Sequence, residues 1–311
     1  MFRTPQFLKR SEDIRIECEK RLEDPGNGQL QEKSGYNFVM EDRNHFYDWY
    51  RAYFLVHFKF EATANGGNIV ADTESAPING SFSLIKNMRV SSAGTELSES
   101  NNIHKGIFIK NLLDYSNDYS GTVAKDQFWY LDVDETTVTD ANASNTGMRE
   151  RALLSNGGKI VETKIPLNRY SFFENLSETL LPPMKIEFEI TLQDDEELIF
   201  QNDGTARRIV VKKFELWVPQ LSFHDEGHKF VNENFLKPKK KKFLKERIME
   251  SSPRTDTGGT CSFTSAIKNV KHVFVFFQQY RKRKSYTQNP YFFYTFDLDG
   301  DNSAKLSTKL W

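Results

Sequence analysis

The residues best suited to binding a metal lie in one short stretch, His224 to His228 (HDEGH). Two imidazoles four positions apart would share one face of a helix, and with a carboxylate they could bind zinc. Gly227 and the polar flanks disfavour a helix here, and no third ligand stands at a suitable spacing. We therefore expect no metal site.

Two acidic clusters could also suggest cation chemistry. Asp297, Asp299 and Asp301 surround a glycine, but the spacing of an EF-hand calcium loop is absent, so a β-turn explains them better. The second cluster follows an aromatic run and consists of Asp132, Asp134 and Glu135. For these three side chains we expect a solvated loop.

No motif for catalysis or nucleotide binding is present. The sequence contains no G-x-S-x-G elbow, no G-x-G-x-x-G and no G-x-x-x-x-G-K, and no carboxylate pair is placed for acid–base work. The expectation is a protein without catalytic residues, cofactor or metal. The basic runs Lys237–Lys245 and Arg281–Lys284 could contact nucleic-acid phosphates, or they could simply be solvated surface.

Composition sets the class of protein. The 311 residues are 38% hydrophobic and 14% aromatic, with 26 Phe, and such rings suit the space between two packed sheets. The net charge of −1 provides no overall attraction to nucleic acid or membranes. No signal peptide or membrane-spanning run is visible. Cys18 and Cys261 are expected to be free thiols, although a single disulfide stays open.

The elements that organise the chain begin with residues 170–192. Met184, Ile186, Phe188, Ile190 and Leu192 alternate with polar residues, which predicts a strand with one buried and one wet face. The Pro182-Pro183 pair just before it fixes where that strand starts. Burying the five apolar side chains could contribute about 10 kcal/mol as an upper bound.

The same reasoning predicts roughly eight to nine short strands between residues 46 and 219, with helices only in loops. Helices are expected at 103–115, capped by Asn101 or Asn102, at 148–154 and at 171–180. Residues 136–147 are expected to form an exposed loop. The predicted strands include 54–60, 81–85, 87–91, 95–97, 128–131, 160–165, 184–192, 197–200 and 207–218, the last of them ending at Pro219.

Four segments follow from these elements. Residues 1–44 are expected to be an N-terminal arm with little packing, containing at most a short helix around Ile14, Ile16 and Leu22. Residues 45–221 predict an all-β, antiparallel β-sandwich. Residues 222–260 look like a basic linker, and 261–311 contain further apolar strands. These last strands either join the first sandwich or begin a second one.

The order of features carries a family resemblance. Residues 76–97 (APINGSFSLIKNMRVSSAGTEL) precede a loop helix, the run FWYLD and a late strand, and the downstream stretches are SAIKNVKHVFVFFQ and Asn289-Pro290-Tyr291. The late segment is marked by Phe172, Phe173, Leu176, Leu181, Pro182, Ile186, Phe188 and Ile190. Over residues 45–311 the chain resembles the hexon-like double jelly-roll major capsid proteins of tailless DNA viruses and of endogenous viral elements, the Polinton/adintovirus-like ones especially.

The resemblance implies a structural role. Residues 45–221 would form the first jelly roll, and 261–311 would begin a second that this chain leaves incomplete after two or three strands. Homotrimers would form pseudo-hexameric capsomers of an icosahedral shell, alongside a minor penton protein and with non-specific contact to packaged DNA. The protein would be made in the host cytoplasm, would assemble there or in the nucleus, and would reside in the virion.

Two other classes of function stay open on the residues alone. A carbohydrate- or protein-binding β-sandwich module would need surface aromatics, for which Trp129 or the pair Tyr50 and Tyr53 are the candidates. An enzyme on a β scaffold would need a set of catalytic residues, and the spacing of residues in the sequence reveals no such set.

Overall fold

The computed structural model describes residues 8–17, 19–23, 31–42, 44–62, 66–177, 179–223 and 286–291, together with residues 229 and 233. Several sequence predictions fall outside these residues. They concern both cysteines, the metal candidate at 224–228, the basic runs at 237–245 and 281–284, the acidic turn at 297–301, the linker and most of 261–311.

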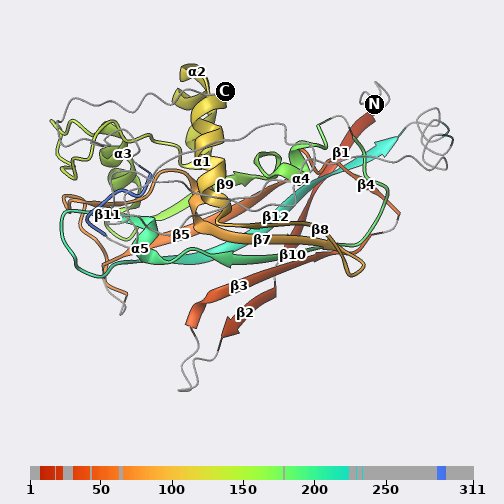
Figure 1. Cartoon of the computed structure of the whole chain (residues 1–311), viewed down its shortest axis with the longest axis horizontal. Helices are drawn as coiled ribbons and strands as arrows, with labels where there is room; N and C mark the ends of the chain where they lie inside the picture. Colours follow the sequence, from red (N-terminus) through yellow and green to blue (C-terminus); the bar gives the residue numbers. More distant parts are fainter. Residues whose placement is uncertain are drawn as a thin grey trace, which may run out of the picture.

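Two antiparallel sheets form the body of the protein (Figure 1). In the first sheet the order is β1 (Leu8–Glu17), β12 (Arg208–Phe223), β5 (Tyr53–Glu61) and β9 (Ile160–Pro166), and β4 (Phe46–Tyr47) also pairs with β12. In the second sheet the order is β2 (Glu19–Glu23), β3 (Gln31–Met40), β10 (Ile186–Leu192), β7 (Ile85–Ser92) and β8 (Thr95–Asn101). A small third sheet pairs β11 (Ile199–Gln201) with β6 (Ser75–Pro77).

The pairing of the strands is that of a jelly roll. Without the short β2, β4, β6 and β11, eight strands remain, and they pair in nested fashion: β1 with β12, β3 with β10, β5 with β9, and β7 with β8. This long four-pair hairpin then folds over, so that β12 also pairs with β5 and β10 with β7. The result is a double-sheet jelly roll.

The core lies between the two sheets. Along β5 the inward residues Phe54, Val56, Phe58 and Phe60 are each at most 2% exposed, as the period of two predicts. Phe188 on β10 packs against Phe54 with ring centroids 5.8 Å apart. The predicted central strand is therefore confirmed, although it begins at Ile186 rather than at Met184.

Helices occupy the connections between strands. The α-helices are α1 (Ile103–Asp114), α2 (Asn117–Gly121), α3 (Thr146–Ser155), α4 (Ser171–Glu174) and α5 (Asp195–Leu198). Figure 1 shows α1 rising from the sheets with α2 near its far end. Three short 3-10 helices are η1 (Ser81–Leu84), η2 (Val123–Gln127) and η3 (Leu167–Arg169). The predicted helices at 103–115 and 148–154 are confirmed, whereas the one at 171–180 is confined to α4.

The prediction for residues 1–44 is wrong. Instead of an arm with little packing, this segment supplies β1, β2 and β3, which extend both sheets, and the short helix around Ile14 and Ile16 is a strand. Tyr36, Phe38 and Met40 on β3 are buried in the core. β1 is the polar edge strand of the first sheet, so its partner β12, about 200 residues away, decides its structure. β3 pairs with β10, about 150 residues away.

Three predicted strands also differ from the structure. Residues 81–84 form η1, because Gly80 adopts a positive φ of 84° and turns the chain just before it. Phe128 is not in a strand but ends η2, donating its N–H to the Lys125 carbonyl at 2.9 Å. The predicted strand at 197–200 is split between α5 and β11, because the acidic run 194–197 favours a helix N-terminus.

Pro219 does not end its strand. β12 continues to Phe223 because its neighbour changes there: Trp217 pairs with Tyr53 of β5, and Gln220 pairs with Tyr47 of β4. Pro219 lies between these two pairings, where its missing N–H leaves no ladder bond unmade. Its carbonyl accepts a bond from the Asp48 N–H at 2.9 Å.

Candidate functional site

The acidic cluster at 132–135 is not the solvated loop that the sequence predicted. Asp132 is only 7% exposed, although its neighbours Val133 and Glu135 face solvent. The adjoining loop is also less exposed than expected, because Thr139, Ala143 and Asn145 are buried within it. A buried carboxylate requires compensating partners, and Asp132 has them on three sides.

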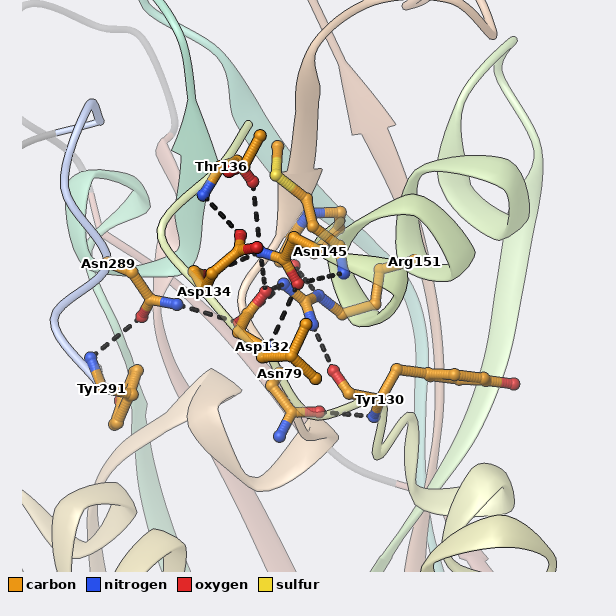
Figure 2. Close-up of polar contacts among 12 residues, drawn as sticks. Asn79, Tyr130, Asp132, Asp134, Thr136, Asn145, Arg151, Asn289 and Tyr291 are labelled. Atoms are coloured by element: carbon orange, nitrogen blue, oxygen red, sulfur yellow. Dashed lines mark hydrogen bonds and ion pairs between the residues drawn. The ribbon is translucent and has the colours of Figure 1, made fainter. Parts of the chain in front are cut away.

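The strongest partner of Asp132 is Arg151, the largest fully buried side chain among the described residues. The Arg151 Nη2 donates to both Asp132 carboxylate oxygens, at 2.7 and 2.9 Å (Figure 2). Its Nε donates to the Pro77 carbonyl at 2.7 Å, and its Nη1 donates to the Tyr130 carbonyl. The guanidinium thus ties α3 to β6 and to the loop after η2.

Asn145 joins the same network at the start of α3. Its Oδ1 caps the helix by accepting from the Met148 N–H at 3.3 Å. Its Nδ2 donates to Asp132 Oδ1 at 2.9 Å and to the carbonyls of Asp134 and Thr136 at 3.0 and 3.1 Å. One side chain therefore fixes both the helix start and the loop that carries Asp132.

The third partner comes from far along the chain. Asn289 donates from Nδ2 to Asp132 Oδ2 at 2.8 Å, and its Oδ1 accepts from the Tyr291 N–H at 2.9 Å (Figure 2). The sequence placed Asn289-Pro290-Tyr291 in the second jelly roll. In the structure these residues lie in a turn packed against the first jelly roll.

Next to this network lies a buried histidine. Gln193 Nε2 lies 3.1 Å from His104 Nε2 and donates to Glu197 Oε2 at 2.9 Å. The Tyr291 ring stands edge-on to the His104 imidazole, with centroids 6.0 Å apart. Burial, with a smaller contribution from the Glu197 charge, raises the pKa of Tyr291 well above its usual range. Its hydroxyl is therefore neutral at physiological pH.

The chemistry of this site is that of an anchor. Both Asp132 oxygens are occupied by donors from Arg151, Asn145 and Asn289, in the geometry of a satisfied ion pair. Among the described residues, no group of three or more His, Cys, Asp or Glu could hold a metal ion. Within the same residues, no helix is long and apolar enough to cross a membrane.

The outer face of the second sheet is polar and carries both charges, as its alternation predicted. A shallow depression on it, about 380 Å³ in volume, is lined by Asn87, Met88, Arg89, Glu96, Glu99, Asn101, Glu189 and Thr191. Arg89 contacts Glu96 at 3.7 Å and Glu189 at 3.5 Å, and Lys185 contacts Glu187 at 2.6 Å.

The aromatic candidates for a binding surface divide between core and surface. Trp129 is buried, with Phe82 and Phe108 rings within 6 Å, so it cannot form part of an exposed row. Tyr50 packs against the core and is half-buried. Tyr53 lies on the outer face of the first sheet, where its ring is parallel to that of Trp217 with centroids 6.4 Å apart.

Sequence reasoning missed Arg151, Asn145 and Asn289. A signal for Arg151 was present, because Met148, Ala152 and Ser155 share the buried face of α3 and Arg151 falls on that face three residues after Met148. A charged residue on a buried face requires a partner of opposite charge. No local signal identified Asn289.

Comparisons with known proteins give matches only among solved structures. No protein-family model and no curated protein matches the chain. The chain is similar to the structure of the Sputnik virophage (9% identity, TM-score 0.45, 69% of this chain and 48% of that one). It is similar to the mavirus major capsid protein, with 11% identity and a TM-score of 0.42 over 69% of this chain and 47% of that one. It is also similar to the Faustovirus major capsid protein, with 9% identity and a TM-score of 0.40 over 72% of this chain and 56% of that one.

This chain spans about half the length of the solved chains that it matches. The fold of this chain follows from its strand order alone, without those similarities. That order makes residues 8–223 a jelly-roll β-sandwich.

Proposed function

We propose that this protein is a structural subunit of a viral capsid, with no catalytic activity. The observation that carries the proposal is the complete set of eight nested strands, since double-sheet jelly rolls are a fold of viral capsid proteins. Lectins and cupins share the fold, so the topology alone does not separate them.

The residues that carry the family resemblance belong to the core of the jelly roll. Seven of the eight, all except Pro182, are buried, and they pack β10 and α4 into the sandwich. Phe173 stacks on Phe188 with centroids 5.7 Å apart, so the "FF" and "IEFEI" parts of the motif form one core contact. The resemblance therefore follows a structural unit of the fold.

The finer proposal follows from the same resemblance. Residues 45–221 belong to the first jelly roll, and 261–311 begin a second jelly roll after a basic linker at 222–260. Three copies form a pseudo-hexameric capsomer, and capsomers tile an icosahedral shell together with a minor penton protein. We assign the chain to the Polinton/adintovirus-like elements, endogenous copies included.

The polar outer face of the second sheet is suited to subunit contact. It carries both signs of charge around Arg89, which matches the polar character of many interface rims. The basic runs would provide non-specific contacts to packaged DNA. The protein would be synthesised in the host cytoplasm, with assembly there or in the nucleus.

The test is the oligomeric state of the longest natural protein that contains residues 1–311. Sedimentation and light scattering at high concentration should give three times the mass of one chain, and electron microscopy should show particles with a pseudo-hexagonal outline. A monodisperse monomer at high concentration would contradict the proposal.

A carbohydrate-binding module is the second candidate, and the stacked pair Tyr53 and Trp217 is the observation that favours it. Lys164 lies over the Tyr53 ring at 5.7 Å, which adds a hydrogen-bond donor beside the aromatic surface. A glycan-array signal that disappears in Trp217→Ala but persists in Trp129→Phe would favour this candidate over the capsid.

A further inference from the structure

We propose that residues 286–291 are a clamp that binds the first jelly roll and anchors the chain to it a second time, beyond the end of β12. The binding surface, called the socket here, consists of Asp132, His104, Phe108 and the Gln201 backbone. This inference stands on the described contacts alone and does not depend on the capsid proposal.

The clamp is fixed at both of its ends. At one end, the Gln201 N–H at the end of β11 donates to the Tyr286 carbonyl at 2.8 Å, and the Tyr286 hydroxyl donates to the Arg207 carbonyl at 3.4 Å. At the other end, Asn289 bonds to Asp132 and Tyr291 is buried. Six consecutive residues are thus held by a backbone bond, a charge-assisted bond and a buried ring.

The polar half of the socket selects an amide. Arg151 and Asn145 already donate to Asp132, and Asn289 supplies a further donor to Oδ2 of this buried carboxylate. A carboxylate at position 289 would place two negative charges within hydrogen-bond distance in a water-poor site. The Asn289 Oδ1 also accepts from the Tyr291 N–H, which shapes the turn around Pro290.

The apolar half of the socket selects an aromatic ring. Tyr291 is 5% exposed and lies 4.9 Å from the Phe108 ring and 6.0 Å from the His104 ring, measured between centroids. The Tyr291 hydroxyl is buried and has no hydrogen-bond partner. Packing of the ring, rather than its hydroxyl, therefore accounts for recognition at this position, and phenylalanine should serve as well as tyrosine.

The clamp has a consequence for the chain between its anchors. β12 ends at Phe223 and the clamp begins at Tyr286, so the stretch 224–285 is attached at both ends to the same jelly roll. A cut anywhere in 224–285 should then leave the C-terminal part bound through the clamp.

The experiment cuts that stretch in the full-length protein. A protease recognition sequence is inserted within residues 250–256, the protein is cleaved after folding, and gel filtration measures how much C-terminal fragment leaves the N-terminal one. The unsubstituted clamp should keep the fragments together. Asn289→Asp should increase the released fraction at least about tenfold, because the charge-assisted bond is replaced by repulsion.

Matched variants separate the two halves of the socket. Tyr291→Ala should also release the fragment, whereas Tyr291→Phe should retain it. Val133→Ala, beside Asp132 at a position where the side chain is 60% exposed, should behave like the parent. Amide hydrogen exchange of the uncut variants should rise at 286–291 and stay unchanged at β5 and β10, which shows that the jelly roll remains folded.

Two outcomes would overturn the proposal. Release of the fragment from the unsubstituted cleaved protein would show that the clamp does not hold it. Equal retention by Asn289→Asp, Tyr291→Ala and the parent, with no change in exchange at 286–291, would show that other contacts hold the fragment.

Discussion

Arg151 and Asp132 form an ion pair in the interior of the molecule. Charged groups rarely lose water unless each is both paired and hydrogen-bonded, and here the guanidinium reaches a carboxylate and two carbonyls. The pair joins α3, β6 and the loop after η2, and through Asn289 it also joins the clamp. Its role is to fix these segments relative to one another.

Removing one member of this pair should be costly. Arg151→Met keeps most of the side-chain volume but leaves the Asp132 charge buried with only amide donors, which should lower the free energy of unfolding by about 3–5 kcal/mol. Urea denaturation would measure this. Arg149→Met, two positions away on the accessible side of α3, should change it by less than about 1 kcal/mol. Equal effects of the two substitutions would contradict a structural role for the pair.

Tyr115 makes stability sensitive to alkaline pH. Burial raises the pKa of Tyr115 to about 12, although Arg169 acts in the opposite direction, and its hydroxyl donates to Gln127 Oε1 at 2.6 Å. In the unfolded chain this phenol titrates near pH 10. Its contribution to stability is therefore fully present below about pH 10 and is lost as the pH rises toward 12.

Thermal unfolding between pH 8 and 11.5 tests this. Tyr115→Phe has no proton to lose, so its melting temperature should fall less steeply above pH 10 than that of the parent. The difference in melting temperature between the two proteins at pH 7 gives the effect of losing the hydrogen bond to Gln127, and this difference is subtracted from the values at higher pH. Parallel curves for the two proteins across the alkaline range would refute the assignment.

At the scale of elements, β1 and β3 show how far strand formation depends on partners. β1 contacts β12 across about 200 residues of sequence, and β3 contacts β10 across about 150. β3 contributes Tyr36, Phe38 and Met40 to the core, and Phe38 packs against Phe54 and Phe214 at 5.2 and 5.3 Å. These strands are therefore integral to the sandwich.

Deleting residues 1–42 should abolish the cooperative fold. The deletion removes three buried side chains, on the order of 5 kcal/mol of apolar burial or more, and exposes the edges of β12 and β10. That loss is comparable with the whole stability of a typical domain. Near-ultraviolet circular dichroism and thermal unfolding should show no native transition. A truncated chain that melts cooperatively would restore the view that these residues are an arm.

For the whole molecule, the nested strand pairs couple the two ends of the jelly roll. The outermost pair, β1 with β12, joins the two ends of the jelly roll, and the clamp adds a contact from residues 286–291. The capsid proposal belongs to this scale, because shell formation uses broad surfaces of a rigid sandwich rather than a single reactive group.

The sequence by itself determined the class of fold and its central strands. Strict alternation along residues 54–60 and 184–192 could be interpreted locally, because a strand with one buried face records its environment in every second residue. The helices at α1 and α3 followed from equally local rules.

Only the tertiary structure decided the role of the polar residues. Asp132 is in an acidic run that resembles a solvated loop, and it becomes an anchor because Arg151 and Asn289 reach it from 19 and 157 positions away. The same holds for β1, whose polar sequence becomes a strand because β12 supplies its hydrogen-bond partners. Contacts of this kind depend on how the whole chain folds back on itself, and no local pattern encodes them.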